Sequence, residues 1–285
     1  MMKTAVAWRA AYATDPGLER GVNEDRVLVD ESRGIFLVVD GMGGRAAGET
    51  AAETAVRSIS EQFTGAGADV EQRIRLAITQ ANNRIYELAQ SDQTYSGMAC
   101  VLTLVALEDQ QVTVGHVGDT RLYLIWNGNV RKITSDHSPV GEQEQQGELT
   151  EEQAMRHPRR NEVFRDVGSR LHNPDDPNFI EVRQFPFRPD AAMLLCSDGL
   201  TDVLTSSQIM TIVEQYDGNP DSVARELVRA ANQAGGLDNI SVVFIAGPEF
   251  LGSRSNTLVD MRPRHAATRA SRTNVPWRRM ALSVF

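Results

Sequence analysis

Four apolar runs of this chain begin or stop abruptly at an aspartate, and this pattern constrains the fold more than any other feature. The run Ile35-Phe-Leu-Val-Val, for example, passes directly into Asp40-Gly41. The four aspartates are Asp40, Asp119, Asp198 and Asp238. Short continuous apolar runs are typical of buried strands, and a rigid strand end is a good position for a ligand of a hard cation. The pattern therefore predicts a buried sheet with carboxylates at its end, suited to Mg²⁺ or Mn²⁺.

An Asp-Gly pair also has an ordinary explanation, because both residues are common in turns. Asp217-Gly218 precedes a predicted helix and is expected to be such a turn. Asp175 and Asp176 lie between two prolines and are expected in a solvated loop. For any single Asp-Gly pair, a turn is a better explanation than a metal ligand. Turns do not explain why four aspartates each lie at the end of an apolar run.

Charge is unevenly distributed along the chain. The whole chain has a formal charge of −9, residues 252–285 carry +6, and residues 1–251 therefore carry −15. Such an acidic body argues against a nucleic-acid groove, which needs clustered Lys and Arg, so no nucleic-acid partner is expected. The charge is compatible with a cation site, although a solvated acidic surface is its simpler explanation.

Alternating and β-branched segments predict strands, and two long helical patterns lie among them. The predicted strands are 4–12, 27–29, 35–39, 99–107, 111–117, 121–126, 130–133, 179–185, 193–196 and 240–246. The predicted helices are 46–63 and 70–90, with later helices beginning at Thr150, Thr205 and Asn219. Links of hairpin length within 99–134 exclude parallel crossovers there. The order of elements predicts an α+β layered domain with antiparallel sheets.

The chain is predicted to form one domain followed by a tail. Its 285 residues are enough to bury a large core without a disulfide or a structural metal. Residues 1–247 are expected to form the domain, with a polar surface flap at about 137–177. Residues 248–285 are rich in Arg, Ser and Thr and are expected to be a disordered tail.

Two cysteines, Cys100 and Cys196, are too few for a disulfide framework and indicate a reducing compartment. Neither a secretory signal nor a membrane-spanning run is apparent, so a cytoplasmic protein is expected. The sequence leaves open whether the native chain extends beyond Phe285. Contact with a membrane is expected only if the tail continues into an anchor.

One further segment contains Arg20, Glu24 and Asp25. The planar guanidinium of arginine fits phosphate oxygens, and Arg20 precedes a strand that is expected to pair near Asp40. An arginine beside acids is more often one half of a surface ion pair, so this segment decides nothing by itself.

Five motifs follow one another along the chain: Arg20-x-x-x-Glu24-Asp25, Val39-Asp40-Gly41-Met-Gly-Gly44, Gly115-x-x-Gly118-Asp119-Thr-Arg121, Ser197-Asp198-Gly199-Leu200 and Asp238-Asn239-Ile-Ser241. Their order and spacing resemble those of type 2C protein phosphatases, the metal-dependent PPM family, in its bacterial form. The resemblance covers about residues 4–247. It implies a four-layer α-β-β-α sandwich, in which two antiparallel sheets flanked by helices hold a dinuclear metal site at one end.

The resemblance also implies a role for each aspartate. Asp40 would bridge two ions of Mn²⁺ or Mg²⁺, and the Gly41 carbonyl would bind one of them. Asp198 and Asp238 would complete the protein ligands of the other ion. Asp119 would hold a third, weaker ion together with Asp198.

Around these ligands, Arg20 would bind the substrate phosphate, and Glu24 and Asp25 would hold water molecules on the ions. A hydroxide that bridges the two ions would hydrolyse phosphoserine or phosphothreonine. The reaction would need no phospho-enzyme, so the lack of an activated nucleophilic side chain is no objection.

The chain departs from the family pattern at Met42, where many members have a histidine that protonates the leaving group. The general acid is therefore unassigned. His116, His137 and His157 are candidates, and a metal-bound water is preferred over all three. Cys196 is expected to be buried rather than nucleophilic.

These features predict a monomeric, cytoplasmic protein serine/threonine phosphatase that acts on phosphoproteins and opposes a bacterial serine/threonine kinase. One alternative is a phosphoprotein-sensing module with little turnover. Degenerate modules of that kind would have lost metal aspartates, whereas this chain keeps them. A second alternative is a phosphatase of small phosphate esters, which the sequence does not separate from the first prediction.

Overall fold

The computed structural model describes residues 8–43, 47–64 and 69–252. The strands in these ranges are β1 Arg9–Asp15, β2 Arg26–Asp30, β3 Ile35–Met42, β4 Ala99–Glu108, β5 Gln111–Val117, β6 Arg121–Trp126, β7 Asn129–Lys132, β8 Glu181–Pro186, β9 Ala192–Cys196 and β10 Ile240–Ala246. The helices there are α1 Ala47–Gln62, α2 Val70–Ser91, α3 Pro139–Gln145, α4 Glu151–Met155, α5 Asp198–Thr201, α6 Ser206–Val213 and α7 Pro220–Gln233, with a 3₁₀ turn at Gln93–Tyr95.

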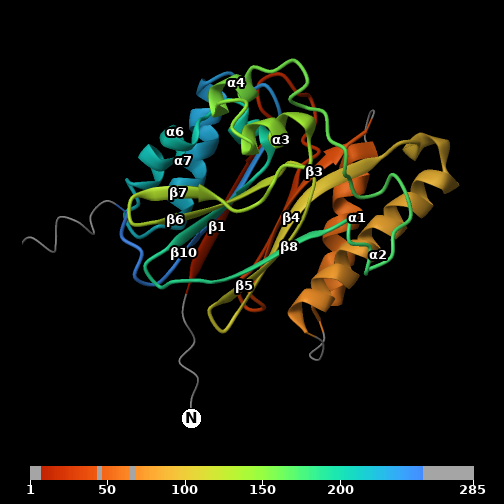
Figure 1. The fold of residues 1–285 in the computed structure, drawn as a ribbon, viewed down its shortest axis with the longest axis horizontal. Coiled ribbons are helices and arrows are strands. Elements are labelled where there is room, and N and C mark those ends of the chain that lie inside the picture. Colours follow the sequence, from red (N-terminus) through yellow and green to blue (C-terminus); the bar gives the residue numbers. More distant parts are fainter. Residues whose placement is uncertain (1–7, 44–46, 65–68, 253–285) are drawn as a thin grey trace, which may run out of the picture.

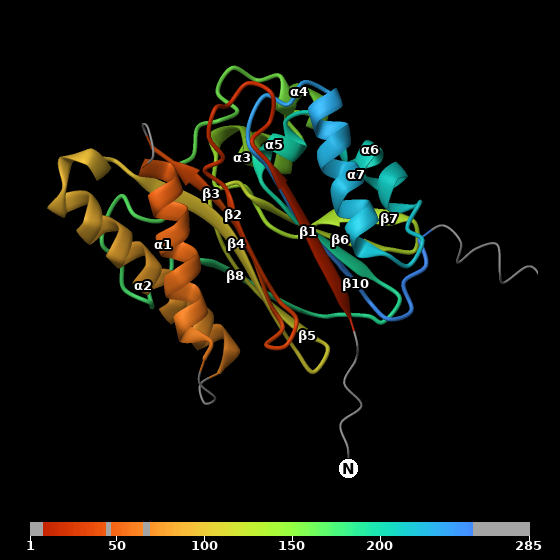
Figure 2. The ribbon, with the colours of Figure 1, turned by 180° about the vertical axis from the view of Figure 1, so that it is seen from behind.

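The strands form two five-stranded sheets, and every pairing within them is antiparallel. The first sheet has the order β1-β10-β9-β6-β7, and the second has the order β2-β3-β4-β5-β8. Helices α1 and α2 cover the outer face of the second sheet, and α6 and α7 lie beside the first sheet (Figures 1 and 2). The predicted α-β-β-α sandwich is confirmed.

Strand β3 shows how the sequence divides the core between the layers. Leu37 and Val39 pack in the cluster beneath α1 and α2, whereas Phe36 and Val38 pack in the cluster between the two sheets. This division follows from the two-residue period of a strand, since neighbouring side chains point to opposite faces. The same period places Asp40 on the face of β3 that looks toward the other sheet.

The structure differs from the predicted elements in a few places. β1 begins at Arg9 and continues to Asp15, whereas residues 4–7 of the predicted strand lie outside the described residues. Within the predicted flap, α3 is a helix that was not predicted from the sequence. Ser138 caps it by accepting a hydrogen bond from the backbone N–H of Gly141, and Pro139 occupies its first turn, so a local signal was present.

The helices in the described ranges are too short or too polar to cross a membrane. Most of the predicted tail, residues 253–285, lies outside those ranges. The described packing continues past Gly247, because Phe250 is buried against Tyr216 and Phe244.

For the phosphatase activity that the resemblance implies, we expect truncation after Gly252 to leave hydrolysis of a small aryl phosphate within about twofold of the full chain. The removed segment lacks apolar periodicity, carries +6 and follows the last core strand in the sequence, so the core is expected not to depend on it. The measurement is kcat/KM for the aryl phosphate in both proteins at saturating Mn²⁺. A large loss of this activity would mean that the segment packs on the domain.

Candidate metal centre

The structure brings the four strand-end aspartates together at one end of the sandwich, at the seam between the sheets. Asp40 lies near the end of β3 and Asp119 follows β5, both from the second sheet. Asp198 follows β9 and Asp238 precedes β10, both from the first sheet. Burial, followed by repulsion from the other three and from Asp25, raises the pKa of Asp40 well above its ordinary value.

Two buried carboxylate oxygens at this seam have no hydrogen-bond partner in the described part of the chain. They are Oδ1 of Asp25 and Oδ1 of Asp198. Burial is the main cause that raises the pKa of Asp25 to about 7, although the Ser197 hydroxyl donates to its Oδ2 at 2.8 Å. Burial and then repulsion from Asp119 raise the pKa of Asp198 well above its ordinary value. Unpartnered buried oxygens of this kind are costly unless a cation satisfies them.

Arg20 is engaged at the centre rather than free in solution. Its guanidinium donates to Oδ2 of Asp238 at 2.7 Å, with side-chain exposures of 50% and 25% for Arg20 and Asp238. Arg20 therefore lies beside one of the predicted metal ligands, as expected. In this structure its partner is the carboxylate of Asp238 and not a phosphate. An exposed guanidinium of this kind can exchange one oxyanion for another.

Asn239 connects the Arg20 segment to the centre, and the sequence analysis quoted it without giving it a role. Its Oδ1 accepts from the backbone N–H of Glu24 at 2.8 Å, and its Nδ2 donates to the carbonyls of Pro16 and Val22 at 2.9 Å each. One buried amide thus fixes the loop that presents both Arg20 and Glu24. Its place directly after Asp238 was the only sequence signal.

The turn after β3 depends on glycine because three backbone segments meet there. A Cβ on Gly41 would lie 2.2 Å from the carbonyl oxygen of Gly48 and 2.7 Å from that of Glu24. Burial raises the pKa of Glu24, and a hydrogen bond from the Gly48 backbone opposes this rise. The backbones of Glu24 and Gly41 are therefore in close contact, which only a glycine at position 41 allows. This contact is consistent with the prediction that both residues belong to the same metal centre.

The flap reaches the centre through an ion pair that the sequence did not reveal. Arg160 donates to Oδ2 of Asp202 at 2.9 Å, and Asp202 lies in the turn after α5. Asp202 also borders a cavity lined by Asp119 and Asp198. Burial is the main cause that raises the pKa of Asp119 to about 7, and repulsion from Asp136 adds to it.

The three histidines considered as general acids are occupied elsewhere. His116 is buried between the Thr103 hydroxyl at 3.0 Å and the Ser135 carbonyl at 3.1 Å, and burial lowers its pKa to about 4. His137 accepts from the backbone N–H of Gly118 at 3.0 Å, and its other ring nitrogen lies near Arg165 and Glu181. Nδ1 of His157 accepts a hydrogen bond from the backbone N–H of Arg159 in the flap. These contacts favour a water molecule over any histidine as the proton donor.

Cys196 is fully buried, and burial raises the pKa of its thiol to about 12. The nucleophile of a reaction is the thiolate, which such a pKa suppresses at neutral pH. The predicted burial of Cys196 is confirmed, and both its burial and its raised pKa argue against a nucleophilic role.

Whether these residues fit divalent cations can be judged from their chemistry. Within residues 8–43, 47–64 and 69–252, no three His, Cys, Asp or Glu side chains are already arranged to hold one ion. Binding would therefore need side-chain movements, of which release of Asp238 by Arg20 is one. The carboxylates are nevertheless oxygen donors that repel one another, and two have unpartnered oxygens. Hard cations such as Mn²⁺ and Mg²⁺ would supply both the missing partner and the missing charge.

Fold and site together define a class: metal-dependent hydrolases built as an α-β-β-α sandwich. The family model of protein phosphatase 2C matches residues 19–233. A serine/threonine phosphatase of Listeria welshimeri is 35% identical over an alignment of 246 residues that covers 83% of this chain and 94% of the relative. The chain belongs to the type 2C protein phosphatase family, and it is a metal-dependent phosphoprotein phosphatase.

Solved structures agree with this family. The serine/threonine phosphatase PstP of Mycobacterium tuberculosis is similar with a TM-score of 0.75 and 28% identity, over 84% of this chain and 98% of that one. A structure of the PstP catalytic domain in complex with two manganese ions has a TM-score of 0.73 and 27% identity, over 84% and 97% of the two chains.

Proposed function

We propose that the centre at the seam of the two sheets hydrolyses phosphoserine and phosphothreonine in proteins. The observation that carries this proposal is the convergence of desolvated aspartates from both sheets beside an exposed arginine. Asp40, Asp198 and Asp238, with the Gly41 carbonyl, would hold two ions of Mn²⁺ or Mg²⁺. Asp119 and Asp198 would hold a third, weaker ion.

Bound divalent cations supply a nucleophilic water at neutral pH and neutralise charge on the phosphoryl oxygens. The chain's own residues position the reaction. Asp25 is held in place by hydrogen bonds, since Ser197 donates to its Oδ2 at 2.8 Å and Ser197 in turn accepts from the Ser241 backbone at 2.9 Å. Asp25 and Glu24 would orient water molecules at the centre, and Arg20 would turn from Asp238 to the substrate phosphate.

We propose further that the substrates include proteins phosphorylated by a bacterial serine/threonine kinase, that the enzyme works in the cytoplasm, and that it acts as a monomer. The first point follows from the reaction, because a serine/threonine phosphatase reverses what such a kinase does. Phosphoproteomics of a strain that lacks the phosphatase would test it. We expect a larger phosphorylated fraction at the serine and threonine residues that the kinase phosphorylates.

Hydrolysis of a phosphoserine peptide with Mn²⁺, with Mg²⁺ and with EDTA tests the proposal directly. Turnover is expected with either ion and is expected to stop with EDTA, because the centre retains its full set of carboxylates. Tight binding of the phosphopeptide without turnover in Mn²⁺ would instead support the sensing alternative.

Arg20→Ala is expected to lower kcat/KM for a phosphopeptide about tenfold to a hundredfold. One charge-assisted contact to phosphate is worth roughly 1.5–3 kcal/mol, and each 1.36 kcal/mol corresponds to tenfold. The effect should lie mainly in KM, measured at saturating Mn²⁺. An unchanged kcat/KM would restrict Arg20 to its ion pair with Asp238.

A further inference from the structure

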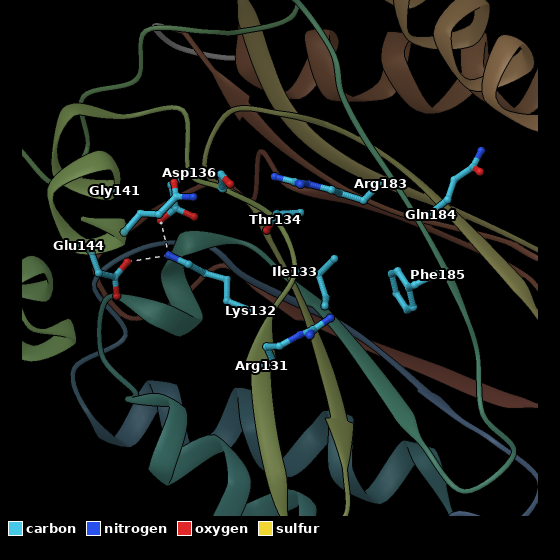
Figure 3. A pocket seen from close by; sticks show the side chains of 12 residues that line it. Arg131, Lys132, Ile133, Thr134, Asp136, Gly141, Glu144, Arg183, Gln184 and Phe185 are labelled. Carbon is cyan, nitrogen blue, oxygen red and sulfur yellow. Dashed lines mark hydrogen bonds and ion pairs between the residues drawn. The ribbon is translucent and has the colours of Figure 1, made fainter. Parts of the chain in front are cut away.

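A groove of about 510 Å³ lies outside the metal centre, where edge strands of the two different sheets face each other. We call it the edge groove. Its walls come from β7 and the segment that follows, from β8, and from α3 (Figure 3). The residues that matter for its chemistry are Arg131, Lys132, Ile133, Arg183 and Phe185. Pockets of this size hold ligands as large as several amino-acid residues.

The carboxylates of the edge groove are already neutralised. Asp136 and Glu144 are 4% and 16% exposed. Nζ of Lys132 lies 2.6 Å from Oε2 of Glu144, and a terminal guanidinium nitrogen of Arg121 lies 2.7 Å from Oδ2 of Asp136. Figure 3 shows Lys132 with both of these acidic residues. These groups offer little net charge to a ligand.

The charge that remains exposed in the groove is positive. Arg131 is exposed, and its side chain makes no hydrogen bond or ion pair with any other described residue. Arg183 is 52% exposed and uses its Nε for Glu181 at 2.7 Å, which leaves its terminal nitrogens for a ligand. The two guanidinium groups extend from β7 and β8 into the gap between them (Figure 3). These two guanidinium groups lie on a body, residues 1–251, whose formal charge is −15.

The walls of the groove suit an extended peptide better than a small anion. Among the described strands, β7 pairs only with β6 and β8 pairs only with β5, so each has an outer edge with free backbone donors and acceptors. Such edges can pair with a peptide strand. Ile133 and Phe185 are half-buried and add apolar surface between the arginines.

The edge groove shares a wall with the metal centre. Asp136, Gly141 and Glu144 line both the groove and the cavity that contains Asp119 and Asp198. A protein segment whose phosphorylated residue lies at the centre can therefore continue over this wall into the groove.

We propose that the edge groove binds an acidic stretch of the phosphoprotein substrate, next to its phosphorylated residue, through Arg131 and Arg183. The proposal rests on the proposed function of the metal centre. It makes the enzyme selective for phosphosites with flanking Asp or Glu, through binding rather than through the chemical step.

The test compares two phosphoserine peptides that differ only in flanking Asp and Glu against Asn and Gln, together with an aryl phosphate. The variant is R131A/R183A, and both positions are exposed. The matched control is R225A/R229A, which removes the same charge from exposed positions of α7. For R131A/R183A we expect kcat/KM for the acidic peptide to fall about threefold to thirtyfold, which corresponds to two exposed ion pairs. The fall should lie in KM and shrink in high salt.

The neutral peptide and the aryl phosphate should change less than twofold in either variant. The proposal is overturned if R131A/R183A leaves the preference for the acidic peptide unchanged, or if R225A/R229A lowers it equally. Binding of an unphosphorylated acidic peptide, followed by fluorescence anisotropy at low salt, tests the groove without any turnover. Loss of this binding in R131A/R183A alone supports the groove, and binding of inorganic phosphate without the acidic peptide overturns it. Failure of the wild type to hydrolyse even the aryl phosphate would count against the centre and not against the groove.

Discussion

Asp40→Asn is expected to abolish turnover while leaving the sandwich folded. The change keeps the volume of the side chain and removes the charge that would hold two cations. Loss of several kcal/mol of charge stabilisation by metal ions corresponds to roughly a thousandfold loss in kcat. The measurement is phosphopeptide hydrolysis at saturating Mn²⁺, with Asp175→Asn as the control because Asp175 is exposed in a loop. A rate near that of the wild type would remove Asp40 from the metal assignment.

In the metal-free protein, the same variant is expected to increase stability above about pH 4, although it abolishes turnover when metal is present. The pKa of Asp40 is raised well above its ordinary value in the fold, and the pKa values of Asp25 and Asp119 are raised to about 7. A carboxyl with a raised pKa contributes stability that is fully present below its unfolded pKa, near 4, and is lost as pH rises through the folded value. The metal-free wild type should therefore become less stable between about pH 4 and pH 8.

Asn at position 40 does not ionise, so the metal-free variant should lose less stability over this range. We expect Asp40→Asn to unfold at a higher temperature than the wild type at pH 8 in EDTA, and at a similar temperature at pH 4. Each kcal/mol shifts the midpoint by about 2–4 °C for a domain of this size. Mn²⁺ should raise the midpoint of the wild type more than that of the variant. Equal pH profiles for the two proteins would contradict the raised pKa.

Met42→His is expected to raise turnover of a phosphoserine peptide more than turnover of an aryl phosphate. Met42 lies two residues after Asp40 in β3 and therefore on the same face of the strand. A thioether donates no proton, whereas general acid catalysis is typically worth 10²–10⁴-fold for a poor leaving group. A phenolate, with a pKa near 10 as in tyrosine, needs less help than a serine alkoxide.

The measurement is the ratio of the two kcat values in wild type and variant across pH 6–9. Met42→Gln serves as a control, since it changes polarity without adding a titrating group. If the ratio is the same in all three proteins, a water molecule already protonates the leaving oxygen. That result would leave the assignment of the aspartates untouched.

Local pattern predicted the antiparallel sheets and the aspartates at the strand ends, whereas the four-layer sandwich and the shared metal site were implied by the resemblance to type 2C phosphatases. A buried strand such as β3 has an unbroken apolar run, and its end is marked by Asp40-Gly41. The contacts that the sequence did not predict join residues far apart in the chain. Asn239 binds the backbone of Glu24, and Arg160 of the flap binds Asp202. Neither pair has a periodicity or spacing that reveals it, because the fold alone determines which loops meet.

The pairing of β1 with β10 has a consequence for how the enzyme is made. β1 joins the first sheet only through β10, in the register from Arg9 opposite Ala246 to Asp15 opposite Ile240. On the ribosome, β1 emerges first and waits for its partner until almost the whole domain has been synthesised. Asp238 arrives with that same last strand. On the proposed assignment of Asp238 as a metal ligand, a nascent chain would complete its first sheet and its metal site in the same final step.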